Sequence, residues 1–232
     1  VTIVGIQGVP AQYGGFESLT ENLIGEHKGD DVRYTVFCSA KDMKQRLAEH
    51  KGAELKYIPL RANGIQSIPY DIVSLMKVPE DTDVILMLGV SGCMFFPLFR
   101  LFCKKRLIVN IDGLEHRRGK WNRLAKWMLK FSEGMAVRYA DVVIADNKVI
   151  QDYVREEYGK EAVMIAYGGD HAIRNVSPEF EASVLDKYGL KGPHAIYLTT
   201  MIKYPEGITV PDLCEACSKD KSDASRMLSL LE

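Results

Sequence analysis

The amino-acid sequence predicts a doubly wound α/β domain, in which helices cover both faces of a Rossmann-like parallel sheet. Two observations predict this fold class. Short runs rich in valine, isoleucine and leucine alternate along the chain with longer segments of helical periodicity. Several of the short runs are also apolar at every position, which is typical of parallel strands that are buried on both faces.

The elements follow one another in a regular order. The apolar runs predict seven strands, over residues 1–6, 33–38, 54–60, 83–88, 106–111, 141–146 and 162–167. Helical patterns separate most of these strands, over residues 16–27, 67–77, 120–139 and 148–158.

The character of the chain changes after the segment "IAYGGD" at 165–170. A helix is expected over 177–190, because this stretch begins with Ser-Pro-Glu and the helix can end at Gly189. A strand expected at 194–200 would open a second domain, but only 32 residues follow it. We therefore expect a first domain over 1–170 and, over 171–232, a linker with an incomplete second domain, either as a fragment or with segments absent from this sequence.

Composition limits the classes of function. The chain has 232 residues, 47% hydrophobic residues and a formal net charge of −1, so no overall positive field draws it to nucleic acid. Its five cysteines are irregularly spaced, which indicates reduced thiols in a cytoplasmic protein. Cys214 and Cys217 form one CxxC pair, but without a second pair no zinc site is expected. No signal peptide is apparent, and the apolar run 93–103 is too short to span a membrane.

The first candidate site is the loop "GIQGVPAQYGGFESLTENLI" at 5–24, where a strand passes through several glycines into a helix. Gly14 and Gly15 permit a close backbone approach, and the amino end of the helix favours an anion. A tight strand-to-helix connection is an equally good interpretation. Glu17 lies in the first turn of the expected helix, where the helix dipole stabilises a negative charge. Alternatively, its carboxylate faces a sugar hydroxyl. The loop matches neither the dinucleotide fingerprint GxGxxG nor a P-loop.

The second candidate site is the segment "NIDGLEHRRGKW" at 110–121, which follows a strand with a buried pattern. Ligands of open α/β sheets bind at the carboxyl ends of the strands. Carboxylates beside cations can do acid–base work or orient a polar substrate, and a solvated charged loop is the alternative. The residues that carry this chemistry are Asp112, Glu115, His116, Arg117 and Arg118.

The helix that follows is amphipathic, with an apolar stripe that is expected to face the core. The stripe consists of Trp121, Leu124, Met128, Phe131 and Met135. Both tryptophans of the chain lie in its most basic region, because residues 100–130 hold ten basic and two acidic side chains. Aromatic and basic groups together favour docking on an anionic membrane surface. The candidate membrane-surface residues are Trp121, Arg123, Lys126, Trp127 and Lys130. Nucleic-acid binding is not favoured, since no recognition motif accompanies the charge.

Four segments, "GVPAQYGGFESLTENL", "NIDGLEHRRGKW", "ADVVIADNKVIQDYV" and "IAYGGD", resemble the N-terminal half of a family 4 (group 1) glycosyltransferase of the GT-B fold. The resemblance covers residues 1–171 and is nearest to the bacterial rhamnosyltransferase-like subgroup of capsule and surface polysaccharide assembly. It implies that Gly14, Gly15 and Glu17 approach the donor diphosphate. It also implies that Gly169 and Asp170 belong to the linker between the two domains.

The same resemblance implies a cytoplasmic, metal-independent, retaining transferase without a cofactor, located at the inner face of the membrane. It would move a sugar such as rhamnose from a nucleotide-diphosphate sugar to a glycan or lipid-linked acceptor, and residues 1–170 would form its acceptor-side domain. Asp112 occupies the place where the family commonly carries a histidine, with His116 four residues later. Glu206 and Glu215 have eight residues between them, whereas the family's glutamate pair has seven. Two alternatives stay open, a non-catalytic acceptor-binding module and a nucleotide-binding oxidoreductase, although the latter needs a GxGxxG motif.

Overall fold

The structure is a computed structural model that describes residues 1–166, apart from 13, 28, 30, 112, 114, 115 and 117–121, and a few residues after 199. Those few are 200, 201, 204, 206–209, 212 and 213. The chain divides into two compact units, Val1–Tyr167 and Gly168–Glu232. Within the second unit, Leu213 is buried. The predicted helix at 177–190, nearly all of the predicted strand at 194–200 and the linker residues Gly169 and Asp170 lie outside the described residues.

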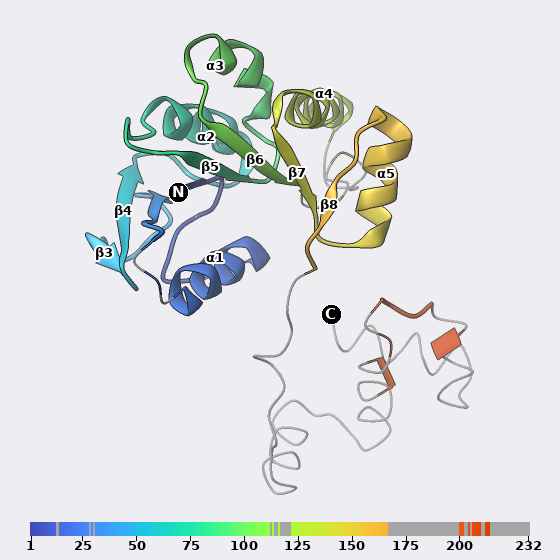
Figure 1. Cartoon of the computed structure of the whole chain (residues 1–232), viewed down its shortest axis with the longest axis horizontal. Coiled ribbons are helices and arrows are strands. Elements are labelled where there is room, and N and C mark those ends of the chain that lie inside the picture. Colours follow the sequence, from blue (N-terminus) through green and yellow to red (C-terminus); the bar gives the residue numbers. More distant parts are fainter. Residues whose placement is uncertain are drawn as a thin grey trace, which may run out of the picture. The chain divides into compact units, whose positions relative to one another are not determined.

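The first unit is built on one eight-stranded sheet, with the strand order β3-β4-β2-β1-β5-β6-β7-β8 (Figure 1). Every neighbouring pair is parallel except β3 and β4. The strands are β1 (Thr2–Val4), β2 (Thr35–Ser39), β3 (Glu49–His50), β4 (Ala53–Ile58), β5 (Val84–Leu88), β6 (Arg106–Ile111), β7 (Val142–Ala145) and β8 (Val163–Met164). All seven predicted strands are therefore confirmed. The edge strand β3 was missed because two residues carry no periodicity.

The four predicted helices are also confirmed. They are α1 (Gly15–Glu26), α2 (Ser67–Met76), α4 (Arg123–Tyr139) and α5 (Lys148–Tyr158). Asn122 and Asn147 cap α4 and α5, since their side chains accept hydrogen bonds from the third backbone N–H of each helix, at 2.8 and 3.0 Å. The structure adds two short 3-10 turns, η1 (Gly64–Gln66) and η2 (Cys93–Phe95), and the helix α3 (Phe96–Phe102), all unpredicted.

The sheet separates two hydrophobic clusters. On one face, α1 packs through Phe16, Leu23 and Ile24 against strand residues such as Ile3. On the other face, α2, α3, α4 and α5 pack against the sheet around side chains such as Tyr70. Figure 1 shows α1 on the opposite side of the sheet from α2, α3 and α4. Both faces carry helices, so the doubly wound α/β fold is confirmed.

The order of the strands reverses between β1 and β5. From β1 the chain passes outward to β2 and β4, and it then returns to the other side of β1 and builds β5 to β8 in order. The loop after β1 leads to α1 on one face, whereas the loop after β5 leads to η2 and α3 on the other. The two loops therefore diverge at the carboxyl ends of adjacent strands, where α/β sheets bind their ligands.

Two helices hold the loop after β5 in place. Asp71 of α2 is buried and accepts hydrogen bonds from Ser91 Oγ and from the Gly92 N–H, both at 2.9 Å. From the other side, Ser132 of α4 accepts a hydrogen bond from the Met94 N–H at 2.8 Å and donates one to the carbonyl oxygen of Val90. Burial raises the pKa of Asp71 from 3.8 to about 7, because a charged carboxylate is poorly solvated there.

This buried carboxyl predicts a stability that depends on pH. Because the folded-state pKa of Asp71 exceeds its unfolded value, the contribution of this group is fully present below pH 4 and is lost as the pH rises through 7. Asp71→Asn removes the titration and keeps an oxygen that can accept from Gly92. The free energy of unfolding of the wild type should therefore fall by up to about 4 kcal/mol relative to the variant between pH 4 and 8. Urea titrations at several pH values measure this difference, and parallel pH profiles would contradict it.

Candidate functional site

The amino end of α1 forms the first part of the candidate site. Gly14 is the N-cap, with a φ of 85°, and as a glycine it makes no side-chain capping hydrogen bond. A Cβ atom at Gly14 would lie 2.4 Å from Glu17 Oε2, whereas a Cβ atom at Gly15 would meet no described atom within 4 Å. Open space in front of an uncapped helix end suits a bound anion, because backbone N–H groups and the helix dipole point there. The predicted strand–loop–helix geometry is present.

Two carboxylates of α1 clamp the glycine-containing loop onto its own helix. Glu17 Oε1 accepts a hydrogen bond from the Gln7 N–H at 2.8 Å, and Glu21 Oε2 accepts one from the Ala11 N–H at 3.1 Å. Glu17 is buried, with 7% of its surface exposed. The structure thus gives Glu17 a partner within the protein, and its contact with a sugar hydroxyl or a diphosphate stays a prediction. Its carboxylate supports the loop, because a buried backbone N–H needs an acceptor.

The loop after β5 forms the second part of the candidate site, and the sequence interpretation missed it. Gly89 has a φ of 93°, and a Cβ atom there would lie 3.8 Å from the ring of Phe16, in the first turn of α1. The loop therefore runs close to the amino end of α1. The sequence signal was a strand followed by "GVSG" at 89–92, a pattern similar to the opening loop. Asp71 and Ser132 give this loop its fixed position.

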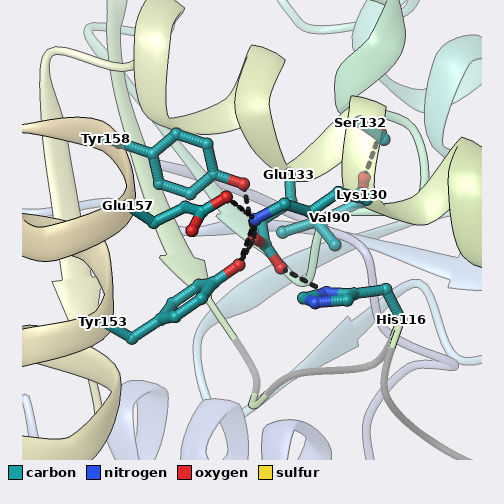
Figure 2. A network of polar contacts seen from close by, with 8 residues as sticks. All are labelled: Val90, His116, Lys130, Ser132, Glu133, Tyr153, Glu157 and Tyr158. Atoms are coloured by element: carbon teal, nitrogen blue, oxygen red, sulfur yellow. Dashed lines mark hydrogen bonds and ion pairs between the residues drawn. The ribbon is translucent and has the colours of Figure 1, made fainter.

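The loop after β6 forms the third part of the candidate site. Of the predicted residues in this segment, the structure describes His116, whereas Asp112, Glu115, Arg117, Arg118 and Trp121 lie outside the described residues. His116 is half-buried, and its Nδ1 atom lies 3.1 Å from Glu133 Oε2 (Figure 2). The imidazole ring also lies beside the ring of Tyr153, with 6.2 Å between centroids. His116 is thus anchored to α4 and α5.

Glu133 is the centre of a buried polar cluster that the sequence interpretation also missed. Its side chain is 2% exposed, and its Oε1 atom accepts hydrogen bonds from the hydroxyl groups of Tyr153 and Tyr158, each at 2.6 Å. The Lys130 Nζ atom lies 3.4 Å from the same oxygen. Burial, and then the neighbouring Glu133 carboxylate, raise the pKa of both phenols above the ordinary value of 10. Both tyrosines therefore keep their protons at neutral pH.

Lys130, one of the predicted membrane-surface residues, has partners within the protein. Its ammonium group contacts Glu133 and Tyr153, pairs with Glu157 Oε1 at 2.8 Å and lies over the rings of Tyr153 and Tyr158. Although burial opposes the charge, hydrogen bonds to Glu157 and Tyr153 raise the pKa of Lys130. Lys130 therefore joins α4 to α5, although its side chain stays 33% exposed.

The predicted orientation of α4 is partly wrong. The buried residues of α4 are Ser132, Glu133, Ala136 and Val137. Leu124 and Phe131, which were expected in the core, are 66% and 45% exposed. Trp127 is 65% exposed, and its ring stacks on Phe131 with centroids 5.9 Å apart. The inner face of α4 carries the polar groups that bind the β5 loop and α5, so apolar side chains are left outside.

Three further observations concern metal ions, thiols and the membrane. Among the described residues, no group of three or more histidine, cysteine or acidic side chains is arranged to hold a metal ion. Cys38, Cys93 and Cys103 are buried free thiols, whereas Cys214 and Cys217 lie outside the described residues. Within the part of the chain that the structure describes, no helix has the length and apolarity to cross a membrane.

The model of the family described as a domain of unknown function (DUF1972) matches residues 1–170, so the chain belongs to this family. A search of curated proteins found no match. Among solved structures, the chain is similar to a sucrose-phosphate synthase from Thermosynechococcus elongatus, with a TM-score of 0.62 and 11% identity. The similarity covers 99% of this chain and 66% of that protein.

At 11% identity this similarity concerns the fold. It assigns the first unit to the doubly wound architecture of the GT-B fold, which the sequence predicted. The chain spans 66% of the length of the sucrose-phosphate synthase, just under two thirds.

Proposed function

We propose that this member of the DUF1972 family is a glycosyltransferase that moves a sugar from a nucleotide-diphosphate donor to an acceptor. One observation carries the proposal. The amino end of α1 begins at a glycine N-cap, and at Gly15 the described residues leave open space beside the point where the strand order reverses. The similarity in fold to a sucrose-phosphate synthase supports sugar transfer as the class of reaction.

The chemistry of such a transfer fits this edge of the sheet. When the sugar leaves the donor, negative charge develops on the diphosphate, and fixed N–H dipoles can stabilise that charge without reorganisation. We assign this role to the first backbone N–H groups of α1, with Arg117 and Arg118 as further candidates. We assign Asp112, Glu115 and His116 to the sugar, because they follow the carboxyl end of β6. The reaction is expected to retain configuration and to need neither a metal ion nor a cofactor.

The finer identity of the substrates rests on the sequence resemblance. It favours rhamnose or a related sugar as the group transferred, and a lipid-linked glycan of a bacterial surface polysaccharide as the acceptor. Such an acceptor places the enzyme at the cytoplasmic face of the membrane. The acceptor is expected to bind to the first unit and the nucleotide mainly to the remainder of the protein.

A second proposal is that α4 docks on an anionic membrane surface. Leu124, Trp127 and Phe131 project from one side of α4, where globular proteins rarely leave three large apolar groups. Arg123 lies exposed beside them, and Lys126 is half-buried. The adjacent helix α3 exposes Leu101 to 79%. Tryptophan and basic groups together favour the interface between lipid headgroups and acyl chains.

The diphosphate site predicts the outcome of Gly15→Val. The new side chain would enter the space that the described residues leave open at Gly15, so the fold should persist, and we expect its bulk to keep a diphosphate away from the first N–H groups of α1. Release of nucleoside diphosphate from nucleotide sugars should fall about 100-fold or more. The matched control is Asn22→Val, because Asn22 is exposed two turns later on the same helix. Wild-type rates in a folded Gly15→Val protein would contradict the site.

The membrane proposal predicts a loss of vesicle binding. Arg123→Gln with Lys126→Gln should weaken co-sedimentation with phosphatidylglycerol vesicles about tenfold or more, because each basic residue near the surface contributes about 1 kcal/mol. Trp127→Ser should weaken binding to the same vesicles. The control replaces Lys148 and Arg155 of α5, two cations that pair with Asp152. An equal loss in the control, or no loss in the test variants, would contradict docking through α4.

A further inference from the structure

The contacts around Glu133 determine where the protons of the cluster lie. Tyr153 and Tyr158 keep their hydroxyl protons, and Lys130 has only donor hydrogens, so all three groups direct hydrogen toward Glu133 Oε1. An oxygen that accepts from three donors has no lone pair left to hold a proton. Figure 2 shows Oε1 enclosed by these groups and Oε2 turned toward His116. Glu133 therefore has the donor environment of an ionised carboxylate.

The state of His116 follows from that of Glu133. A carboxylate oxygen has no hydrogen to donate, so the 3.1 Å contact between Glu133 Oε2 and His116 Nδ1 requires the hydrogen to be on Nδ1. In a neutral imidazole, Nε2 then carries a lone pair. His116 Nε2 has no hydrogen-bond partner among the residues that the structure describes. The cluster therefore leaves the Nε2 atom of His116 as an acceptor that no described residue occupies.

We propose that Glu133 is a positioning residue, which holds His116 as the Nδ1–H tautomer and thereby presents Nε2 as an acceptor to a hydroxyl group of the bound sugar. The inference rests on the proposed function for the identity of the ligand. Its chemical basis is independent, because the tautomer is set by Glu133, Tyr153, Tyr158 and Lys130 on α4 and α5. Glu133 does not contact the substrate.

Removal of the Glu133 carboxylate would also lower the stability of the fold, because the buried cluster would lose the acceptor at its centre. Glu133→Gln separates this structural role from the positioning of His116. Three donors surround the Oε1 position, so the glutamine oxygen should remain there and its NH₂ group should face His116. Nδ1 must then accept, and the ring hydrogen moves to Nε2. The variant keeps the shape of the cluster but changes Nε2 from an acceptor into a donor.

The direct test is the ¹⁵N NMR spectrum of the histidines in the full chain at neutral pH, with the His116 signals assigned from a His116→Gln variant. We expect a protonated Nδ1 and an unprotonated Nε2 in the wild type, and the reverse in Glu133→Gln. The matched control is Glu21→Gln, since Glu21 Oε1 lies 2.8 Å from His50 Nε2. It should change only the signals of His50. A wild-type His116 with the hydrogen on Nε2, or on both nitrogens, would overturn the proposal even if Glu133→Gln does not fold.

A double-mutant cycle tests the link to the sugar. Glu133→Gln should lower the turnover of nucleotide sugar about 10- to 100-fold, the loss expected when a polar contact is left unmatched. In the His116→Gln background the same change should lower turnover less than twofold, because Glu133 acts through His116. Equal losses in both backgrounds would overturn the positioning role. A wild type without turnover would instead refute the proposed function, and the NMR spectra would still decide the tautomer.

Discussion

The close approach of β1 and β5 is the constraint on which the candidate site depends. A Cβ atom at Gly5 would lie 2.1 Å from the carbonyl oxygen of Leu88, so no larger residue fits where the chain leaves β1. Because the strand order reverses between these two strands, their loops turn to opposite faces of the sheet. The amino end of α1 then lies beside the loop after β5, and His116 follows the next strand.

Buried polar residues hold this edge in place. Asp71 and Ser132 bind the loop after β5 from two helices, and Glu133 binds the loop after β6 through His116. Ser132 and Glu133 are neighbours on α4, so one helix supports both loops. The use of the inner face of α4 for polar contacts also explains why Trp127 and Phe131 lie outside. The polar inner face of α4 therefore accounts both for the positions of the two loops and for the exposed apolar side chains.

The sequence predicted the sheet and the long helices because apolar runs and helical periodicity record burial directly. The prediction failed at polar residues that are buried in the fold. Glu133 lies three residues before Ala136 on the buried face of α4, a spacing that could have identified it, but the residue type pointed to solvent. Lys130 was assigned to the membrane surface because it lies in the most basic region of the chain, and that pattern does not reveal its contacts with Glu133 and Glu157. Glu17 was recognised as important, yet its partner is the Gln7 N–H, and the sequence gives no sign of such a backbone contact.

The central claim is that a nucleotide-diphosphate sugar binds at the amino end of α1. An amide NMR titration of the chain with uridine, thymidine and guanosine diphosphate sugars tests it most directly. The account predicts that at least one donor causes saturable shifts, largest at Gly14 to Glu17 and at Gly89 to Gly92. Saturable binding that leaves these amides unchanged, with the largest shifts elsewhere in the chain, would contradict the account.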